Sequence, residues 1–135
     1  MNPKTVEQWL IKAGNDFQSA LNLLDSPVII TDSVCFHSQQ AAEKYLKAYL
    51  VFNGREIHKT HDIALLIKEC MAIDSSFAYL LEKEVHFLTP YGTVIRYPDD
   101  FYIPDVEESK EAMRYAEIVR DFVRARLSEE GFIMP

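Results

Sequence analysis

The sequence reads FHSQQAAEKYLKA from Phe36 to Ala48, at the centre of a segment, residues 31–53, that decides the fold. Apolar side chains recur in this segment at steps of three and four, which is the spacing of one buried helix face. They are Val34, Ala41, Ala42, Tyr45, Leu46, Tyr49 and Leu50. Residues 31–33 (TDS) supply N-cap chemistry, and Asn53-Gly54 tolerates the left-handed backbone that ends many helices. The pattern predicts one long helix over residues 31–53.

On both sides of this segment, further stretches carry apolar residues at helical spacing. They are residues 5–25, 61–71, 75–88 and 105–129. Thr60 and Asp74 stand where a side chain can cap the helices over residues 61–71 and 75–88, and Asp105 opens the last helix with a negative charge that suits its positive N-terminal dipole. Glu84 interrupts the apolar stripe of its helix, which places it either at the helix edge or near a polar cavity. Five helices, short connections and no strand pattern predict an all-α, antiparallel, up-and-down helical bundle.

The connection over residues 89–104 differs from the others. It contains three prolines and Gly92, a spacing that predicts no helix. Loops of this length inside compact domains are either functional or disordered. Aromatic residues argue against disorder here; they are Tyr91, Tyr97, Phe101 and Tyr102.

Length and composition are those of an ordinary globular protein. Of the 135 residues, 48% are hydrophobic and 26% are charged, so we expect one core and one domain, residues 1–130, followed by a frayed tail, residues 131–135. The N-terminal stretch lacks the apolar run of a signal peptide, and no apolar run approaches the ~18 residues of a membrane span, which predicts a cytoplasmic protein. Cys35 and Cys70 lie in helical segments and are expected to be buried thiols.

The charge balance limits the ligands that the protein can take. The formal net charge is −7, which disfavours general nucleic-acid binding because phosphates are repelled. Residues 37–61 nevertheless carry two more basic than acidic side chains, whereas residues 99–111 carry five more acidic than basic ones. The first region can therefore attract an anion while the rest of the surface repels it.

A polar row interrupts the apolar surface of the 31–53 helix. His37, Gln40, Lys44 and Lys47 follow one another at steps of three and four, within an arc of about 80° on one face. An imidazole, an amide and two ammonium groups suit an anionic or hydrogen-bonding ligand. We therefore name His37, Gln40 and Lys44 as ligand-binding candidates, with a solvated helix face as the alternative.

A second basic group precedes the next helix. Arg55, His58, Lys59 and His61 stand close to a helix start, where cations and backbone amides together bind anions; a capped loop with exposed histidines is the alternative. No third metal ligand stands at helical spacing with the two histidines, and ExxH is absent, so we expect no metal site and no cofactor. The GxSxG, phosphate-loop and GxGxxG patterns are absent as well.

Arg96 and Tyr97 are the candidates from the long loop. Pro98 forces the residue before it toward an extended backbone, so both side chains are displayed rather than wound into a helix. A guanidinium group can clamp a phosphate, and an aromatic ring can stack on a base. In the alternative interpretation, Arg96 pairs with Asp99 or Asp100 and the loop only packs on the bundle.

These motifs together resemble the HEPN domain family. The run FHSQQAAEKYLKA is followed in the expected order by Thr60-His61-Asp62, by Leu65-Leu66 and by Arg96-Tyr97-Pro98, so the similarity covers essentially the whole chain. The resemblance implies an antiparallel helical bundle and a homodimer. It also implies a minimal nucleotidyltransferase as partner, since many members are encoded beside one in toxin–antitoxin pairs.

One family feature is missing. The resemblance implies a motif for the active members of the family, which are metal-independent endoribonucleases. In this motif an Arg is followed, after four to six residues, by a His. Counted from Arg96, the corresponding positions hold Phe101, Tyr102 and Ile103. The catalytic histidine of the family therefore has no counterpart, although His37 or His61 could reach the site from another helix.

The resemblance and the missing histidine lead to one prediction and two alternatives. The predicted function is binding of nucleotide or RNA by His37, Gln40, Lys44, Arg96 and Tyr97, with a minimal nucleotidyltransferase partner and without full nuclease activity. The first alternative is a metal-independent endoribonuclease toxin that uses Arg96 with a relocated histidine. The second alternative is a non-catalytic interaction scaffold, and the sequence leaves open whether the protein is an enzyme.

Overall fold

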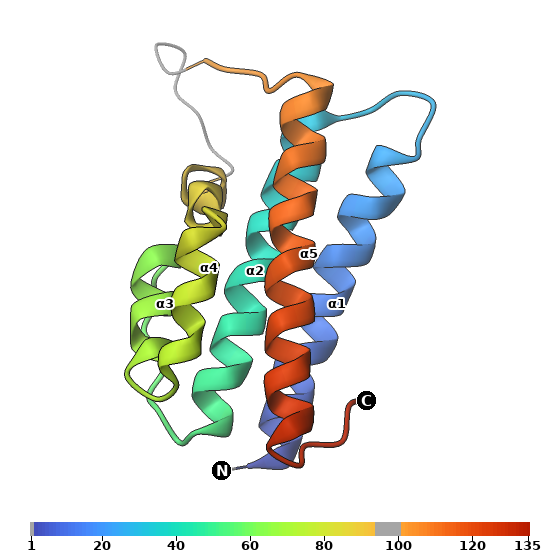
Figure 1. Ribbon diagram of the computed structural model, residues 1–135. Helices are drawn as coiled ribbons and strands as arrows, with labels where there is room; N and C mark the ends of the chain where they lie inside the picture. The colour runs from blue at the N-terminus through green and yellow to red at the C-terminus, as the bar shows by residue number, and fades with distance from the viewer. Residues whose placement is uncertain (1, 94–100) are drawn as a thin grey trace.

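The computed structural model describes residues 2–93 and 101–135. It contains the long helices α1 (Pro3–Leu24), α2 (Thr31–Phe52) and α5 (Val106–Glu129), the shorter helices α3 (Ile63–Met71) and α4 (Ala78–Glu82), and the 3-10 helices η1 (Ser75–Phe77) and η2 (Val85–Gly92). Figure 1 shows the three long helices side by side, with α3 and α4 next to α2 on the side away from α1. The two described ranges contain no strand, which confirms the all-α bundle.

α2 is the central helix. It packs against α1, α3, α5 and η2, and its side chains Tyr45, Leu46, Tyr49 and Leu50 are almost fully buried. A helix with neighbours on several sides must be apolar over most of its circumference, which explains the dense apolar pattern of residues 31–53. Each large apolar side chain buried in this way contributes about 1.5–3 kcal/mol.

The directions of the helices bring distant residues together. α1 and α2 form an antiparallel hairpin, whereas α5 runs beside α2 in the same direction (Figure 1), so Phe132 after α5 packs on Phe52 at the end of α2, with 6.0 Å between ring centroids. Residues 53–62 return along α2 before α3 begins, and His61 consequently contacts Glu43 in the middle of α2. Short connections predict that each helix runs opposite to the one before it. Because residues 53–62 return along α2, α3 runs in the same direction as α2 and the alternation is broken (Figure 1).

The side-chain caps agree with the sequence at some helix starts and differ at others. Asp74 accepts a backbone hydrogen bond as the N-cap of η1, as predicted, and Asp105, expected only to suit the helix dipole, accepts one as the N-cap of α5. α3 is capped by Asp62 instead of Thr60, so the helix starts two residues later than expected. α2 begins without a side-chain cap, and the capping role predicted for residues 31–33 is wrong because residue 31 is itself helical.

The helix predicted over residues 75–88 is broken at Glu84. Glu84 has a left-handed backbone with φ 64°, which separates α4 from η2 and explains why a carboxylate interrupts the apolar stripe. η2 then continues through Pro90 to Gly92, so the prediction that residues 89–92 are non-helical is wrong. A short 3-10 helix accommodates proline because few of its N–H groups take part in internal hydrogen bonds.

The chain end is attached to the bundle. The sequence predicts fraying over residues 131–135, but the Phe132 N–H donates to the Leu127 carbonyl over 3.0 Å and Met134 packs against the core. The assignment of residues 1–130 to one domain stays a prediction. Cys35 and Cys70 are free and buried, as expected.

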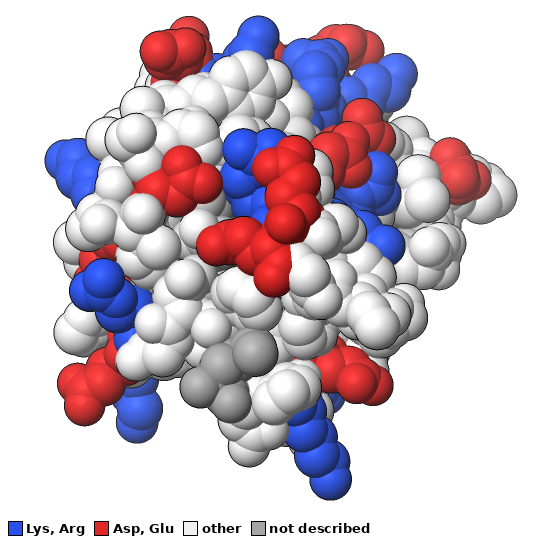
Figure 2. Space-filling model, turned by 60° about the horizontal axis from the view of Figure 1, so that its bottom comes forward, with Lys and Arg blue, Asp and Glu red and all other residues white. Residues whose placement is uncertain are grey.

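The surface carries charges of both signs. Figure 2 shows acidic and basic side chains interspersed over the end of the molecule where the two termini lie. Exposed pairs of this kind, such as Arg126 with Glu129 at 2.5 Å, contribute at most about 1 kcal/mol each. Among the described helices, none has both the length and the apolar character needed to cross a membrane.

Candidate functional site

The polar row predicted on α2 is divided between two clusters. His37 and Lys44 turn toward α1, whereas Lys47 turns inward and is buried. Gln40 lies between them and donates from Nε2 to Gln39 Oε1 over 2.7 Å. The four side chains therefore share one face of the helix, as their spacing predicts, but they have different partners.

The first group, which we name the Asp16 cluster, consists of Asp16, His37 and Lys44. His37 Nδ1 lies 2.9 Å from Asp16 Oδ1, and Lys44 Nζ donates to Asp16 Oδ2. One carboxylate from α1 thus accepts from two cationic or titratable groups of α2. The cluster is partly exposed, and a phosphate oxygen could take the place of either carboxylate oxygen.

The second group, the Glu43 cluster, consists of Gln39, Glu43, Lys47 and His61. Glu43 Oε2 accepts from Lys47 Nζ over 2.8 Å, and Glu43 Oε1 lies 2.7 Å from His61 Nδ1. Gln39 Nε2 donates to Glu43 Oε1 over 3.2 Å and to the His61 carbonyl over 3.0 Å. The Glu43 and Lys47 side chains are only 5% and 7% exposed, so this ion pair lies inside the protein.

The protonation of Glu43 determines the orientation of the imidazole. Burial raises the pKa of the Glu43 carboxyl, but hydrogen bonds from Lys47, His61 and Gln39 outweigh burial and hold the pKa below its usual 4.5. An ionised carboxylate only accepts hydrogen bonds, so His61 Nδ1 carries the proton. The neutral ring consequently has its lone pair on Nε2, for which the described residues supply no hydrogen-bond partner.

His61 is held firmly although its side chain is 61% exposed. A Cβ atom at Gly92 would lie 3.0 Å from both Gln39 Nε2 and His61 Cβ, so a larger residue here would have to push these neighbours apart. The Glu43 cluster and Gly92 thus support the imidazole from its buried side. Such support is the arrangement by which a carboxylate orients a histidine that acts as a general base.

The basic turn predicted before α3 is not assembled into one anion site. His58 Nε2 lies 3.3 Å from Glu69, and these two residues line a cavity of about 200 Å³ with Arg55, Glu56, Leu50 and Ala72. Of the four side chains, the one that hydrogen-bonds to a side chain of α2 is His61. The N–H groups at the start of α3 are capped by Asp62, whose negative charge opposes a bound anion there.

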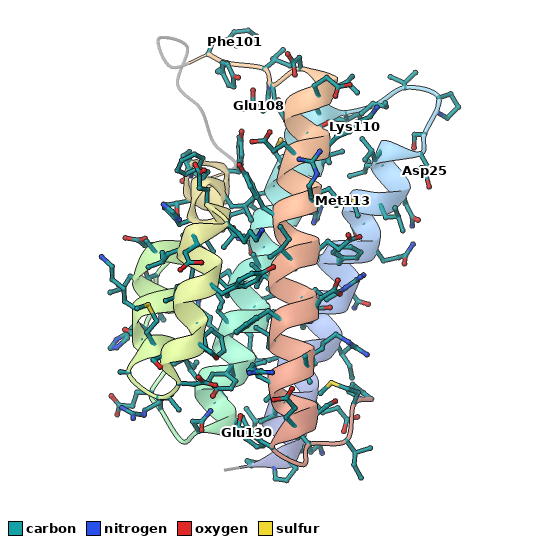
Figure 3. The ribbon with its side chains drawn as sticks, viewed as in Figure 1. Asp25, Phe101, Glu108, Lys110, Met113 and Glu130 are labelled. Atoms are coloured by element: carbon teal, nitrogen blue, oxygen red, sulfur yellow. The ribbon has the colours of Figure 1, made fainter. Side chains whose placement is uncertain are left out.

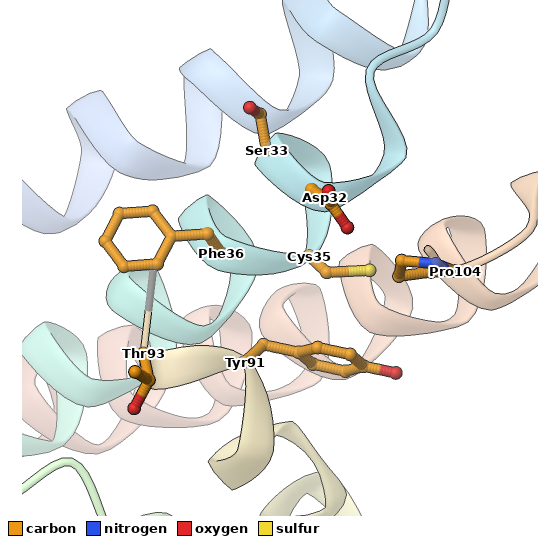
Figure 4. Close-up of a pocket in the computed structure, with 7 residues that line it drawn as sticks. All are labelled: Asp32, Ser33, Cys35, Phe36, Tyr91, Thr93 and Pro104. Atoms are coloured by element: carbon orange, nitrogen blue, oxygen red, sulfur yellow. The ribbon is translucent and has the colours of Figure 1, made fainter. Parts of the chain in front are cut away.

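Arg96 and Tyr97 lie outside the described residues. The described flanks of this segment meet the start of α2, where Thr93 and Pro104 line a cavity of about 90 Å³. The other residues of this cavity are Asp32, Ser33, Cys35, Phe36 and Tyr91. Figure 4 shows the Cys35 side chain above the Tyr91 ring and directed toward Pro104. Burial, followed by the charges of Glu108 and Asp32, raises the pKa of Cys35 to about 12, so this thiol is a packing group.

Two tyrosine hydroxyls converge on one carboxylate near this cavity. Tyr91 and Tyr102 both donate to Glu108, and Figure 3 shows Glu108 and Phe101 together at one end of the molecule. Burial and then the hydrogen bond to Glu108 raise the pKa of Tyr91, and the hydrogen bond to Glu108 raises that of Tyr102. A tyrosine that replaces the missing histidine as a base would need the opposite shift.

Sequence reasoning missed the residues that hold the two clusters. Asp16 comes from α1, Gly92 from η2, and Gln39 and Glu43 from the inner edge of α2. One signal was present, because Gln39 and Glu43 stand four apart within the apolar run of α2, where unpaired polar groups are costly. Within the residues that the structure describes, no three His, Cys, Asp or Glu side chains are grouped to hold a metal ion.

Comparisons with known proteins agree with the helical architecture. The family model for the HEPN domain matches residues 6–126. No curated protein and no solved structure matches the sequence significantly. Since the family model spans α1 to α5 and thus most of the chain, this protein belongs to the HEPN domain family.

Proposed function

We propose that this protein binds nucleotide or RNA through the polar face of α2 and acts with a minimal nucleotidyltransferase partner in a toxin–antitoxin-like pair. The observation that carries the proposal is the Asp16 cluster, in which His37 and Lys44 already hold an anionic oxygen pair. A phosphate group offers the same kind of acceptor. Arg96 and Tyr97 join the ligand from the long loop in this proposal, and Gln40 supplies an amide.

Titration of the purified protein tests this function. Fluorescently labelled single-stranded RNA and free nucleotides are titrated against the wild type, Lys44→Gln and Arg96→Ala, with Lys68→Gln on the exposed side of α3 as the matched control. We expect weaker binding for the first two variants and unchanged binding for the control. Equal binding by all four proteins would remove the site.

The proposed assembly has its own test. Light scattering of the purified protein measures the mass of the assembly in solution. We expect the mass of a homodimer, in a buffer with the pH and salt of the cytoplasm. Co-purification with the product of the neighbouring gene tests the nucleotidyltransferase partner. Tight binding of that partner that is unaffected by Lys44→Gln and Arg96→Ala, together with no RNA binding, would favour the interaction scaffold instead.

A second candidate function is metal-independent RNA cleavage, supported by the orientation of His61. In this reaction Nε2 of the neutral imidazole takes the proton of a ribose 2′-hydroxyl, and the 2′-oxygen attacks the adjacent phosphorus. The bond from phosphorus to the 5′-oxygen breaks, and water protonates the leaving oxygen. The hydroxide so formed recovers the proton from His61. The products are a 2′,3′-cyclic phosphate and a 5′-hydroxyl.

Histidine variants test this candidate. Labelled RNA is incubated in EDTA with the wild type, His61→Gln and His58→Gln; His58 is the matched control because its side chain is also 61% exposed and paired with a glutamate. Cleavage predicts cyclic phosphate from the wild type and the control but not from His61→Gln. Intact RNA at high wild-type concentration would exclude the reaction.

A further inference from the structure

Trp9 stands beside the polar face of α2 and has no part in the function proposed above. The indole packs partly against the core and lines a cavity of about 200 Å³ with Gln8 and Lys12. Lys47 Nζ lies 5.8 Å from the ring centroid. An aromatic surface, an amide and an ammonium group therefore meet at one hollow of the surface.

This hollow lies on the same face of α1 as Asp16. Trp9, Lys12 and Asp16 follow one another at steps of three and four in α1, so they lie on one face of the helix. Asp16 contacts Lys44, and Trp9 contacts Lys47 one turn further along α2. The α1–α2 edge thus carries Trp9, Lys12 and the Asp16 cluster in one row, whereas Lys47 supports the ring from the buried side.

The chemistry of the row suits a nucleobase beside a phosphate. A base stacks on an aromatic ring irrespective of its sequence identity, and the Lys12 ammonium group, which lines the same cavity, can attract the backbone phosphate. The Gln8 amide can both donate to and accept from the edge of a base. Because the core fixes part of the Trp9 ring, a ligand would meet an aromatic surface that is already in place, which lowers the entropy cost of binding.

We infer that Trp9 is a stacking platform for the base of a nucleotide or of single-stranded RNA, with Lys12 facing the phosphate. This inference rests on the proposed function, since it adds a base subsite to the same ligand. A stacking site at Trp9 would bind a ligand with a heterocyclic base more tightly than a simple phosphate or a phosphosugar.

The chain has one tryptophan, so its fluorescence reports this subsite alone. The wild type is titrated with UMP, AMP and ribose 5-phosphate, with excitation at the red edge of the indole band, where nucleotides absorb little. We expect saturable quenching by both nucleotides and none by ribose 5-phosphate. This measurement needs no variant, so it holds even if substitution of Trp9 impairs folding.

Variants give the second measurement. Trp9→Leu should weaken binding of labelled RNA by about 5- to 150-fold, the equivalent of about 1–3 kcal/mol for one stacked base. Trp9→Phe should lose less, because it keeps an aromatic face. Phe87→Leu is the matched control, since Phe87 is an exposed aromatic residue of η2.

The outcomes separate this inference from the proposed function. If RNA binds but Trp9 fluorescence and Trp9→Leu affinity are unchanged, the base subsite is wrong and the proposed function stands. Equal quenching by ribose 5-phosphate and UMP would also overturn the subsite. If neither RNA nor nucleotide binds the wild type at low salt, both proposals fall.

Discussion

At the scale of single residues, Asp16 determines how much of the positive charge on α2 is open to a ligand. Its carboxylate accepts from His37 and Lys44, so an incoming phosphate must compete with it. We predict that Asp16→Asn binds labelled RNA about 3- to 10-fold more tightly, because a neutral amide competes less well. Urea unfolding should show a loss of about 1 kcal/mol from the weakened hydrogen bonds.

Asp25→Asn is the control for this prediction, because Asp25 lies at the end of the same helix and is exposed. It removes the same charge from the molecule without touching the cluster. If Asp25→Asn raises the affinity as much as Asp16→Asn does, the gain comes from net charge alone and the competition does not exist.

Glu43 makes stability depend on pH. Since its folded-state pKa lies below the usual 4.5, the ion pair contributes fully above about pH 4.5, and the contribution is lost as the pH falls through the lowered folded-state value. At about pH 7, Glu43→Gln should cost about 3–5 kcal/mol, because the Lys47 ammonium is left buried without its counter-charge. Urea unfolding at several pH values should therefore show a steeper acid loss for the wild type, and parallel curves would contradict this role.

At the scale of elements, two glycines are expected to respond in opposite ways to alanine. Gly92→Ala places a methyl group 3.0 Å from His61 Cβ and should cost about 1–3 kcal/mol. Gly14 is the matched control, because it lies inside α1 and its nearest neighbour would be the Tyr45 hydroxyl at 3.9 Å. Gly14→Ala should add about 0.5–1 kcal/mol. Thermal unfolding measures both, and a stabilising Gly92→Ala would refute the close approach of η2.

Hydrophobic periodicity in the sequence predicts the long helices but not the irregular segment between α4 and η2. The long helices follow directly from their apolar spacing, since α2 begins and ends within two residues of the expected positions. The break at Glu84 does not follow from the apolar spacing, because a left-handed backbone at a non-glycine residue costs local energy that only tertiary packing offsets. The helical turn through Pro90 was missed because 3-10 geometry has a weaker sequence signature than an α-helix.

At the scale of the whole molecule, the candidate site could be predicted only in part. The spacing of His37, Gln40 and Lys44 correctly places them on one face of α2. Their partners could not be found, because Asp16 is 21 residues away from His37 and His61 is 18 residues away from Glu43. Such contacts depend on how α1 and the segment before α3 pack on α2, and local pattern carries little information about that.

The net charge of −7 predicts how binding responds to salt. An acidic protein that binds RNA must do so through a few localised cations, and for single strands the slope of log Kobs against log salt is about −0.7 per phosphate contact. With Lys12, Lys44 and Arg96 as contacts we expect a slope of about −2.1, and about −1.4 for Lys12→Gln. Titrations of a labelled oligonucleotide at several sodium chloride concentrations measure both. A slope near zero would exclude phosphate contacts by these lysines.

The position of α5 beside α2 has a consequence for biosynthesis. The hairpin of α1 and α2 is complete at Phe52, but the helix that covers the other side of α2 ends only at Glu129. At translation rates of about 5–20 residues per second, the ribosome needs about 4–15 s to make the missing chain. During this interval the nascent hairpin presents the uncovered apolar side of α2, which is a target for chaperones.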